Sequence, residues 1–210
     1  FSNPSSPYLS AHVLGWTNGA IPGVDYCYVQ ALDVQGDYAY VIDYGPFQDD
    51  DTFGLYIINI SDPSNSHVVT RYTNFVSRGW DIDVEGDYAY IADSYGGMEG
   101  IDISDPYAPT TISYCYLGDS AQGIHVDGDY AYIANYILGG VQVIALWDPT
   151  APLNVGYYKR SGCFALNVDA EENYVYIADG LSGMQIYNNL LVQVSSEEEI
   201  VDLPEMKSWN

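Results

Sequence analysis

The sequence predicts an all-β protein, a β-propeller of four four-stranded repeats, and three observations support this fold class. First, the 210 residues include 22 tyrosines and 20 glycines, a balance that favours strands and tight turns over helices. Second, two short motifs recur in register along the chain. Third, proline falls in the expected turns and not inside the expected strands, as ladder hydrogen bonding requires.

The first motif is Gly-Asp-Tyr-Ala-Tyr, which is altered in its last copy, and the second is an Asp-Pro turn. The first motif occupies residues 36–40, 86–90, 128–132 and 172–176. The second occupies residues 3–4 (as Asn-Pro), 62–63, 105–106 and 148–149. The two motifs define repeats at about 2–60, 61–103, 104–146 and 147–189. A repeat of roughly 40 to 45 residues with four strands is typical of a propeller blade.

Each repeat reads as four short strands, which in the second repeat cover about 67–73, 82–84, 88–92 and 98–103. A Gly-Asp turn of the kind that joins hairpin strands separates the second strand from the third. Alternation places Tyr88 and Tyr90 on one face of the third strand and Ala89 and Ile91 on the other. Packing of the large face of one blade on the small face of the next would bury each ring, at about 2 to 3 kcal/mol per ring.

These motifs resemble a known family. Residues 86–92 read Gly-Asp-Tyr-Ala-Tyr-Ile-Ala, and residues 97–104 read Gly-x-x-x-Ile-Asp-Ile-Ser. With the Asp-Pro start, this pattern resembles the LVIVD-repeat propellers of bacterial and archaeal surface and secreted proteins, over about residues 1–189. The resemblance implies a propeller that acts as a scaffold, without a shared set of catalytic residues. Residues 150–189 depart most, because they lack the Gly-Asp turn and the Asp-Ile-Ser ending.

The offset between the chain and its repeats bears on closure. Phe1 aligns with the ends of the fourth strands, so the opening strand, at about 8–14, has no preceding blade and could complete the last one. Such an exchange would close a four-bladed ring and remove exposed strand edges. In the alternative, the repeats form an arc that other chains complete. Residues 190–210 read as an acidic tail or linker.

The charge excludes two classes of partner. Aspartate and glutamate total 29 against 5 lysines and arginines, a formal net charge of −24. Nucleic acids and anionic membranes need clustered basic residues, and no apolar run reaches the length of a membrane span. We therefore expect no nucleic-acid partner and no membrane insertion. The composition favours an exported protein, and the disulfide state of Cys27, Cys115 and Cys163 stays open.

One candidate site lies on the second strand of each repeat, the innermost strand of a propeller blade. A polar residue stands there between apolar neighbours in every repeat. The four residues are Asp33, Asp83, His125 and Asn167. They could line the central channel and bind a cation or another ligand. In the alternative, each side chain bonds the backbone of a neighbouring blade, as buried polar groups must.

A second set ends the third strands, just before the variable loops. It consists of Asp43, Asp93, Asn135 and Asp179. Oxygen ligands of this kind suit calcium, the one cofactor we consider. No Asp-x-Asp-x-Asp-Gly loop is present, and Asp and Asn commonly cap turns instead.

A third candidate is the insertion in the first repeat, which carries an aromatic residue and three carboxylates. These are Phe47, Asp49, Asp50 and Asp51, and such a loop is either a binding loop or a solvated acidic loop. Trp80 and Trp147 differ from their repeat equivalents, so they are candidates for stacking on a glycan. Packing in the core or in a turn is the alternative for both.

The sequence thus predicts a non-enzymatic extracellular or cell-surface scaffold. It would bind proteins, or copies of itself through its terminal strands, and assemble into a surface structure or filament. The alternative is a propeller that binds or cleaves carbohydrate, with convergent carboxylates of perturbed pKa on one face of the ring.

Overall fold

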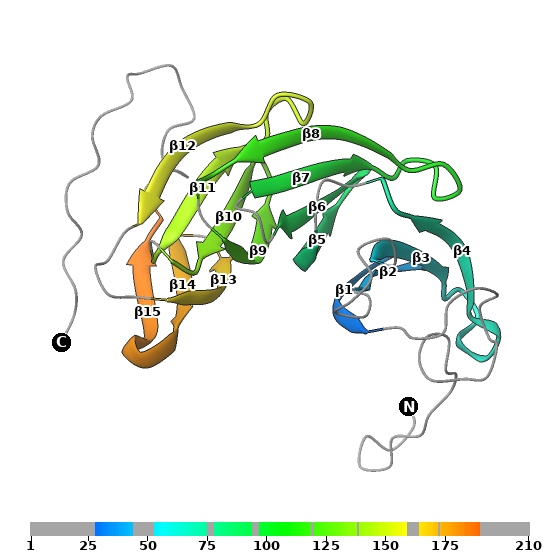
Figure 1. Cartoon of the computed structure of the whole chain (residues 1–210), viewed down its shortest axis with the longest axis horizontal. Helices are drawn as coiled ribbons and strands as arrows, with labels where there is room; N and C mark the ends of the chain where they lie inside the picture. The colour runs from blue at the N-terminus through cyan, green and yellow to red at the C-terminus, as the bar shows by residue number, and fades with distance from the viewer. Residues whose placement is uncertain are drawn as a thin grey trace, which may run out of the picture.

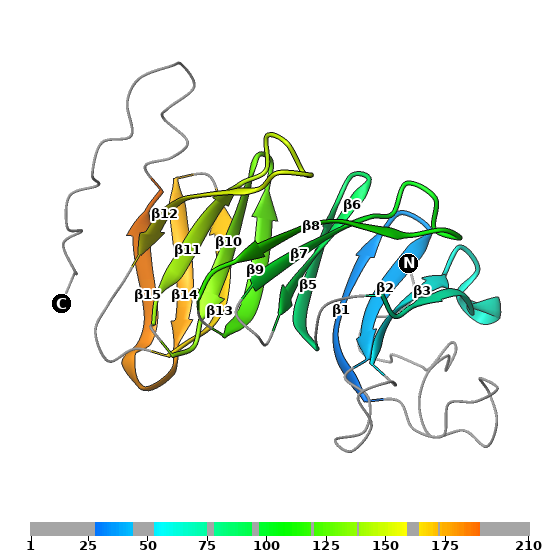
Figure 2. The same ribbon diagram turned by 45° about the horizontal axis from the view of Figure 1, so that its top comes forward.

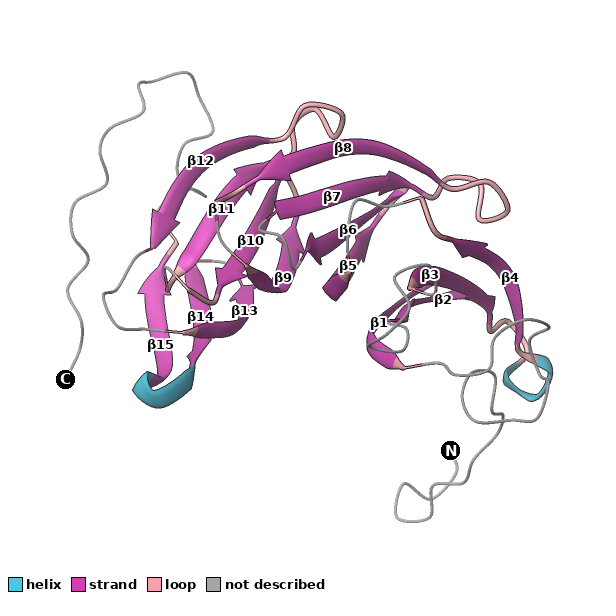
Figure 3. Cartoon of the chain, in the orientation of Figure 1, coloured by secondary structure: helices cyan, strands magenta, loops and turns pink. Residues whose placement is uncertain are grey.

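The computed structural model describes residues 28–43, 53–74, 78–93, 97–118, 120–137, 139–158, 164–171 and 173–189. Figure 3 shows strands joined by loops and turns, with two single helical turns at Pro63–Asn65 and Gly180–Ser182. The predicted all-β fold is confirmed. None of the described residues forms a helix with the length and apolar character of a membrane span.

The strands form four antiparallel sheets, each built from consecutive strands. The first sheet contains β1 (Val29–Gln35), β2 (Tyr38–Asp43), β3 (Gly54–Asn59) and β4 (His67–Tyr72). The second contains β5 (Gly79–Glu85), β6 (Tyr88–Asp93), β7 (Gly97–Asp102) and β8 (Thr110–Tyr116). The third contains β9 (Ala121–Asp127), β10 (Tyr130–Asn135), β11 (Val141–Ala145) and β12 (Leu153–Tyr158). The fourth contains β13 (Ala165–Glu171), β14 (Tyr174–Asp179) and β15 (Gly183–Asn188).

The four sheets stand side by side along an open arc. Their first strands are the inner strands, and β1 contacts β5, β5 contacts β9, and β9 contacts β13. Figures 1 and 2 place the first sheet and the last sheet at opposite ends of the arc, with the other two between them. In the described residues, the arrangement is therefore the arc and not the closed ring.

The strand that follows each Asp-Pro turn is the outer strand of the preceding sheet, as the offset of the repeats predicts. Thus β4 pairs with β3, and β8 pairs with β7. The last sheet has three strands in the described part of the chain. The segment at about 8–14 that could complete it lies outside the described residues, as does the 190–210 tail.

Both sequence motifs have a structural cause. The Asp62 carboxylate accepts the Ser64 N–H at 3.0 Å, and Asp105 accepts the Tyr107 N–H at 2.9 Å, so the aspartate of each Asp-Pro turn stabilises the turn with its own side chain. In the Gly-Asp turns, Gly86 has a φ of 61°, a left-handed conformation that favours glycine.

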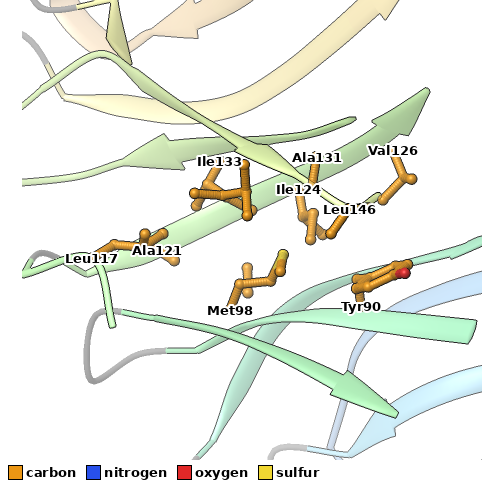
Figure 4. Close-up of a cluster of buried hydrophobic side chains, with 11 residues drawn as sticks. Tyr90, Met98, Leu117, Ala121, Ile124, Val126, Ala131, Ile133 and Leu146 are labelled. Carbon is orange, nitrogen blue, oxygen red and sulfur yellow. The ribbon is translucent and has the colours of Figure 1, made fainter. Parts of the chain in front are cut away.

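Each sheet packs through two faces, which we call forward and backward. The forward face packs on the next sheet along the chain and the backward face on the preceding one. In the second sheet the forward face includes Tyr90 and Met98, and the backward face includes Ile82 and Val84. Figure 4 shows the joint between the second and third sheets, where Tyr90 and Met98 meet Ile124 and other apolar side chains of the third sheet. The predicted packing of large faces on small faces is confirmed.

Candidate functional site

The polar residues of the inner strands tie neighbouring sheets together. Asp33 on β1 accepts the N–H of Val84 on β5 at 2.8 Å. Asp83 on β5 accepts the N–H of Val126 on β9, also at 2.8 Å. These bonds repeat at successive joints because the residues share one register position. The structure thus confirms, for both aspartates, the alternative in which the side chain bonds the backbone of the next blade.

His125 occupies the same position on β9 and contacts the sheets on both sides. Its Nδ1 lies 3.3 Å from Oδ2 of Asp83, and its Nε2 lies 3.0 Å from the carbonyl oxygen of Ala170 on β13. Asp169 Oδ1 is 3.6 Å from Nε2. The hydrogen bond with Asp83 raises the pKa of His125, while partial burial works against the charged form. Since both ring nitrogens face oxygen atoms, these contacts favour the imidazolium form more than water does.

The structure corrects the fourth member of this set. Asp33 pairs with Tyr40 and Asp83 pairs with Tyr90 across their hairpins. On β13 the residue that pairs with the equivalent Tyr176 is Asp169, not Asn167. Asn167 pairs with Ala178 instead, one alternation step earlier, because side chains two residues apart share a face.

Asp81 is a further polar residue of the inner strands, and sequence reasoning missed it. Its two carboxylate oxygens accept the N–H groups of Ile82 and of Ile124, each at 3.0 Å. Burial raises the pKa of the Asp81 carboxyl, and the two N–H bonds oppose that rise. The repeat gave only a weak signal, because the equivalent residues are Ala31, Gly123 and Asn167, of which only Asn167 is polar.

A pocket lies on the forward side of the last sheet. Its lining includes Asp81, His125, Asn167, Asp169, Tyr176 and Met184. Of the predicted channel-lining set, the pocket brings together His125 and Asn167, whereas Asp33 and Asp83 lie at earlier joints. The pocket therefore combines carboxylates, an imidazole and apolar side chains at one end of the arc.

The apolar side chains around this pocket are unusual for the repeat. Met184 pairs with Ala178, as Met98 pairs with Ala92 in the second sheet. Met98 is fully buried, yet Met184 is 64% exposed. Ile186, on the same face, is also exposed. Within the part of the chain that the structure describes, no further sheet covers the forward face of the last sheet, whereas the other three sheets bury theirs. Sequence reasoning did not identify these residues as a site.

The residues predicted as calcium ligands are buried. Each ends the second strand of its sheet, which is the third strand of the sequence repeat. Asp43 accepts the N–H of Tyr28 at 2.8 Å, and Asp179 accepts that of Phe164 at 2.9 Å. Burial, together with the charge of Asp93 and its hydrogen bond from the Tyr114 hydroxyl, raises the pKa of that tyrosine to about 12. In the described ranges, no three His, Cys, Asp or Glu side chains gather as a metal centre would require.

Of the remaining candidates, Trp80 and Trp147 are not among the residues that line this pocket. Phe47, Asp49, Asp50 and Asp51 lie outside the described residues. Trp80 belongs to β5 and is half-buried. Trp147 follows β11 and is exposed, and its ring lies edge-on to Tyr130 with the ring centres 6.1 Å apart.

Comparison with known proteins identifies the repeat. The family described as "LVIVD repeat" matches residues 27–74, 78–116, 118–159 and 164–186. No curated protein matches the chain. The matched ranges follow the sheets of the structure closely. Each of the first three ranges contains all four strands of one sheet, including its outer strand.

Three solved structures illustrate the fold. The computationally designed Ika8 protein is 7% identical, with a TM-score of 0.59 over 77% of this chain and 46% of its own. The designed Ika4 protein is 8% identical, with a TM-score of 0.60 over 87% of this chain and 98% of its own. A proposed 6-phosphogluconolactonase from Bacteroides uniformis is 17% identical, with a TM-score of 0.64 over 78% of this chain and 51% of its own. The matched part thus spans about half the length of the first and third of these chains.

Proposed function

Because the chain belongs to the LVIVD-repeat family, we propose that it is a non-enzymatic scaffold that binds other proteins through the ends of its arc. One observation carries the proposal. On the forward face of the last sheet, Met184 and Ile186 are exposed, whereas the equivalent residues Leu55 and Ile57 of the first sheet are buried. An exposed apolar patch rimmed by polar residues is typical of a protein-binding surface.

The scaffold would act outside the cell or on its surface. The excess of acidic residues and the resemblance to surface and secreted proteins support this location. Protease treatment of intact cells tests it, since a surface protein is cleaved while a cytoplasmic marker survives. A chain that is cleaved only after lysis would contradict the location.

A photo-crosslinker placed on the forward face tests the proposed binding. Tyr174 is half-exposed beside that face, and Tyr116 is exposed on the outer strand β8. Each is replaced by benzoylphenylalanine, which keeps an aromatic ring, and the cells are irradiated. We expect a discrete protein adduct from position 174 and none from position 116. The absence of an adduct at 174 would overturn the proposal.

The pocket favours a second candidate function, namely binding or cleavage of a carbohydrate. It combines Asp81, whose pKa is raised by burial, with the His125 imidazole and the exposed Asp169. A carboxyl of raised pKa is suited to general acid catalysis. With a net charge of −24, the chain would repel a phosphorylated sugar, so a neutral glycan is the substrate class to test.

Activity measurements decide this second candidate. Neutral oligosaccharides and unphosphorylated sugar lactones are incubated with the wild-type chain, with Asp81→Asn and with His125→Gln. Turnover that falls at least about tenfold in both variants would support the candidate. Turnover that neither substitution affects, or no turnover and no binding by calorimetry, would overturn it.

A further inference from the structure

We propose that the forward face of the last sheet binds the backward face of the first sheet of a second copy of this chain, in the stacking that joins successive sheets within one chain. The inference rests on the proposed scaffold function and names the partner. The two ends of the arc carry parts of a joint that the chain makes three times internally, namely the forward face of the last sheet and the inner-strand part of the backward face of the first sheet.

The backward half is bare on the inner strand of the first sheet. Leu32 pairs with Val41, as Ile82 pairs with Ile91 in the second sheet, so the two residues are equivalent. Leu32 is 60% exposed whereas Ile82 is 4% exposed. Val34 is likewise exposed although its equivalent Val84 is buried. The outer part of the same face is already buried in a separate cluster around Ala39 and Tyr56.

The forward face of the last sheet is exposed at positions whose equivalents are buried in the first sheet. Met184 and Ile186 are equivalent to Leu55 and Ile57 of the first sheet, which are both fully buried against the second sheet. Within the chain, each joint brings the inner strands together. Docking in the same mode would place β13 of one copy against β1 of the other, where Leu32 and Val34 are exposed.

Polar groups at the two ends match as well. Asp33 and Asp83 each accept an N–H from a valine of the next sheet. Asp169 stands at the same register position, and its side chain is 73% exposed. At the other end, Val34 occupies the position of those valines, and its N–H is bonded by the neighbouring Asp33 carboxylate at 2.7 Å. In the docked pair, Asp169 of one copy would replace Asp33 as the acceptor of the Val34 N–H of the other.

The open arc and the lengths of two longer solved structures favour two copies in a ring. Two of the solved structures match over 46% and 51% of their own lengths, so this arc corresponds to about half of each longer chain. Two head-to-tail joints between two copies would cover the exposed forward face and the exposed backward residues of each copy, and would leave no open end. The expected assembly has twice the 23.2 kDa mass of one chain.

Charge sets the conditions for the assembly. Each copy carries a net charge of −24, and like-charged copies repel over distances that salt screens. We therefore expect the dimer to strengthen as the salt concentration rises, which is the opposite of an assembly held by ion pairs.

Mixing two variants tests the joint. The forward variant carries Met184→Lys and Ile186→Lys, and the backward variant carries Leu32→Lys and Val34→Lys. All four positions are exposed, and lysine lowers the net negative charge, so general repulsion cannot explain a loss of assembly. Leu153→Lys, at an exposed position on the outer strand β12, is the matched control. Circular dichroism verifies that each variant is folded.

The expected result comes from light scattering between about 1 µM and 500 µM chain at moderate salt. The wild-type chain and the control form the dimer, and each variant alone is monomeric. The mixture of the two variants regains dimers, because one intact forward face meets one intact backward face. In the purified wild-type background, benzoylphenylalanine at position 174 should crosslink to the β1 segment of another copy.

Other results would overturn the proposal. A monomeric wild-type chain over the whole range excludes the second copy, and so does a dimer that survives both variants. A wild-type dimer whose variants stay monomeric when mixed excludes the head-to-tail joint. An adduct in cells between position 174 and a different protein would preserve the scaffold function while refuting self-association. If β1 and position 174 crosslink within one monomer, the chain closes on itself instead.

Discussion

Single polar side chains on the inner strands define how each sheet meets the next. Asp33 and Asp83 accept backbone N–H groups, whereas His125 reaches the carbonyl oxygen of Ala170. At the third joint the side chain of the inner strand donates to a backbone carbonyl, whereas at the first two joints it accepts from a backbone N–H. That joint is therefore the one whose strength depends on a group that titrates near neutral pH.

The first prediction concerns His125. Its pKa is raised in the folded chain, first by the hydrogen bond with Asp83 and also by Asp169 and the Ala170 carbonyl. A raised pKa contributes stability that is fully present below the unfolded value of about 6.5 and is lost as the pH rises through the folded value. We expect urea unfolding to show a decrease in stability of the wild-type chain from about pH 6 to about pH 8.

The His125→Asn variant is the control for this prediction. Burial also raises the pKa of Asp81 and of Glu85. Ionisation of these carboxyls therefore also lowers the stability of the folded chain as the pH rises, but at lower pH than for the histidine. Subtracting the variant profile from the wild-type profile isolates the histidine. Parallel profiles above about pH 6 would show that the imidazolium does not strengthen the joint.

The second prediction concerns Gly123, where β9 approaches β13 closely. A Cβ at this position would lie 2.8 Å from the Cα of Asn167 and 3.1 Å from the carbonyl oxygen of Leu166. Because both atoms are backbone, Gly123→Ala should lower the free energy of unfolding by about 1 to 3 kcal/mol. Thermal and urea unfolding measure the loss. Adding Asn167→Ala to this variant should not restore stability. A full restoration would show that the added methyl group clashes with the Asn167 side chain and not with the backbone.

At the scale of elements, the joint between two sheets is the unit that the chain repeats. Each joint combines an apolar contact between a forward and a backward face with a bond between inner strands. In the second joint these are the Tyr90 and Met98 cluster and the bond from Val126 to Asp83. The last sheet carries the same parts without the next sheet, so it offers an internal control for the bond.

The third prediction compares the two equivalent aspartates. Asp83→Ala should cost about 1 to 2 kcal/mol of stability, because it removes a charged acceptor from the Val126 N–H and a neighbour from His125. Asp169→Ala should change the stability of the monomer by no more than about 0.5 kcal/mol, since its carboxylate is exposed. Chemical unfolding at low protein concentration measures both. Equal losses would contradict the assignment of the bond to the joint.

The elements themselves were largely predictable from the sequence. The Asp-Pro and Gly-Asp motifs are local turn signals, and period-two alternation determines which face each tyrosine occupies, so strands and faces were found correctly. The same period explains the error at Asn167. Leu166-Asn167-Val168 and Val168-Asp169-Ala170 both alternate apolar with polar, and a shift of two residues leaves the faces unchanged. The distance to the turn motif does distinguish them, because Asp33, Asp83 and His125 each stand three residues before it, and in the last repeat that position is Asp169. The pairing of Asp169 with Tyr176 agrees with this spacing.

The site was less predictable because burial is not a local property. Nothing in the sequence around Met184 distinguishes it from Met98, which has the same place in its own sheet. Their different exposure depends on whether another sheet follows in space. Asp81 escaped notice for a related reason, since its acceptor role depends on Ile124, which lies 43 residues away in the next sheet.

At the scale of the whole molecule, the arc is a one-dimensional array of sheets. Its contacts join each sheet to its neighbours, and the first and last sheets lie at opposite ends. In such an array, stability is the sum of the sheets and of the joints between them, so an end sheet is held by one joint and a middle sheet by two. Local opening should therefore begin at the ends.

The last prediction follows from this inequality and is measured by amide hydrogen exchange. In dilute solution, amides of β13 and β14 should exchange faster than those of β6 and β10, because the forward face of the last sheet is bare. When the concentration or the salt is raised, a second copy would cover that face and β1. Protection should then increase in β1, β13 and β14 and stay constant in β6 and β10. The Met184→Lys and Ile186→Lys variant should lose this concentration dependence while keeping its protected middle. Protection that is uniform along the chain at every concentration would mean that the arc closes on itself, since closure within one chain gives every sheet two joints.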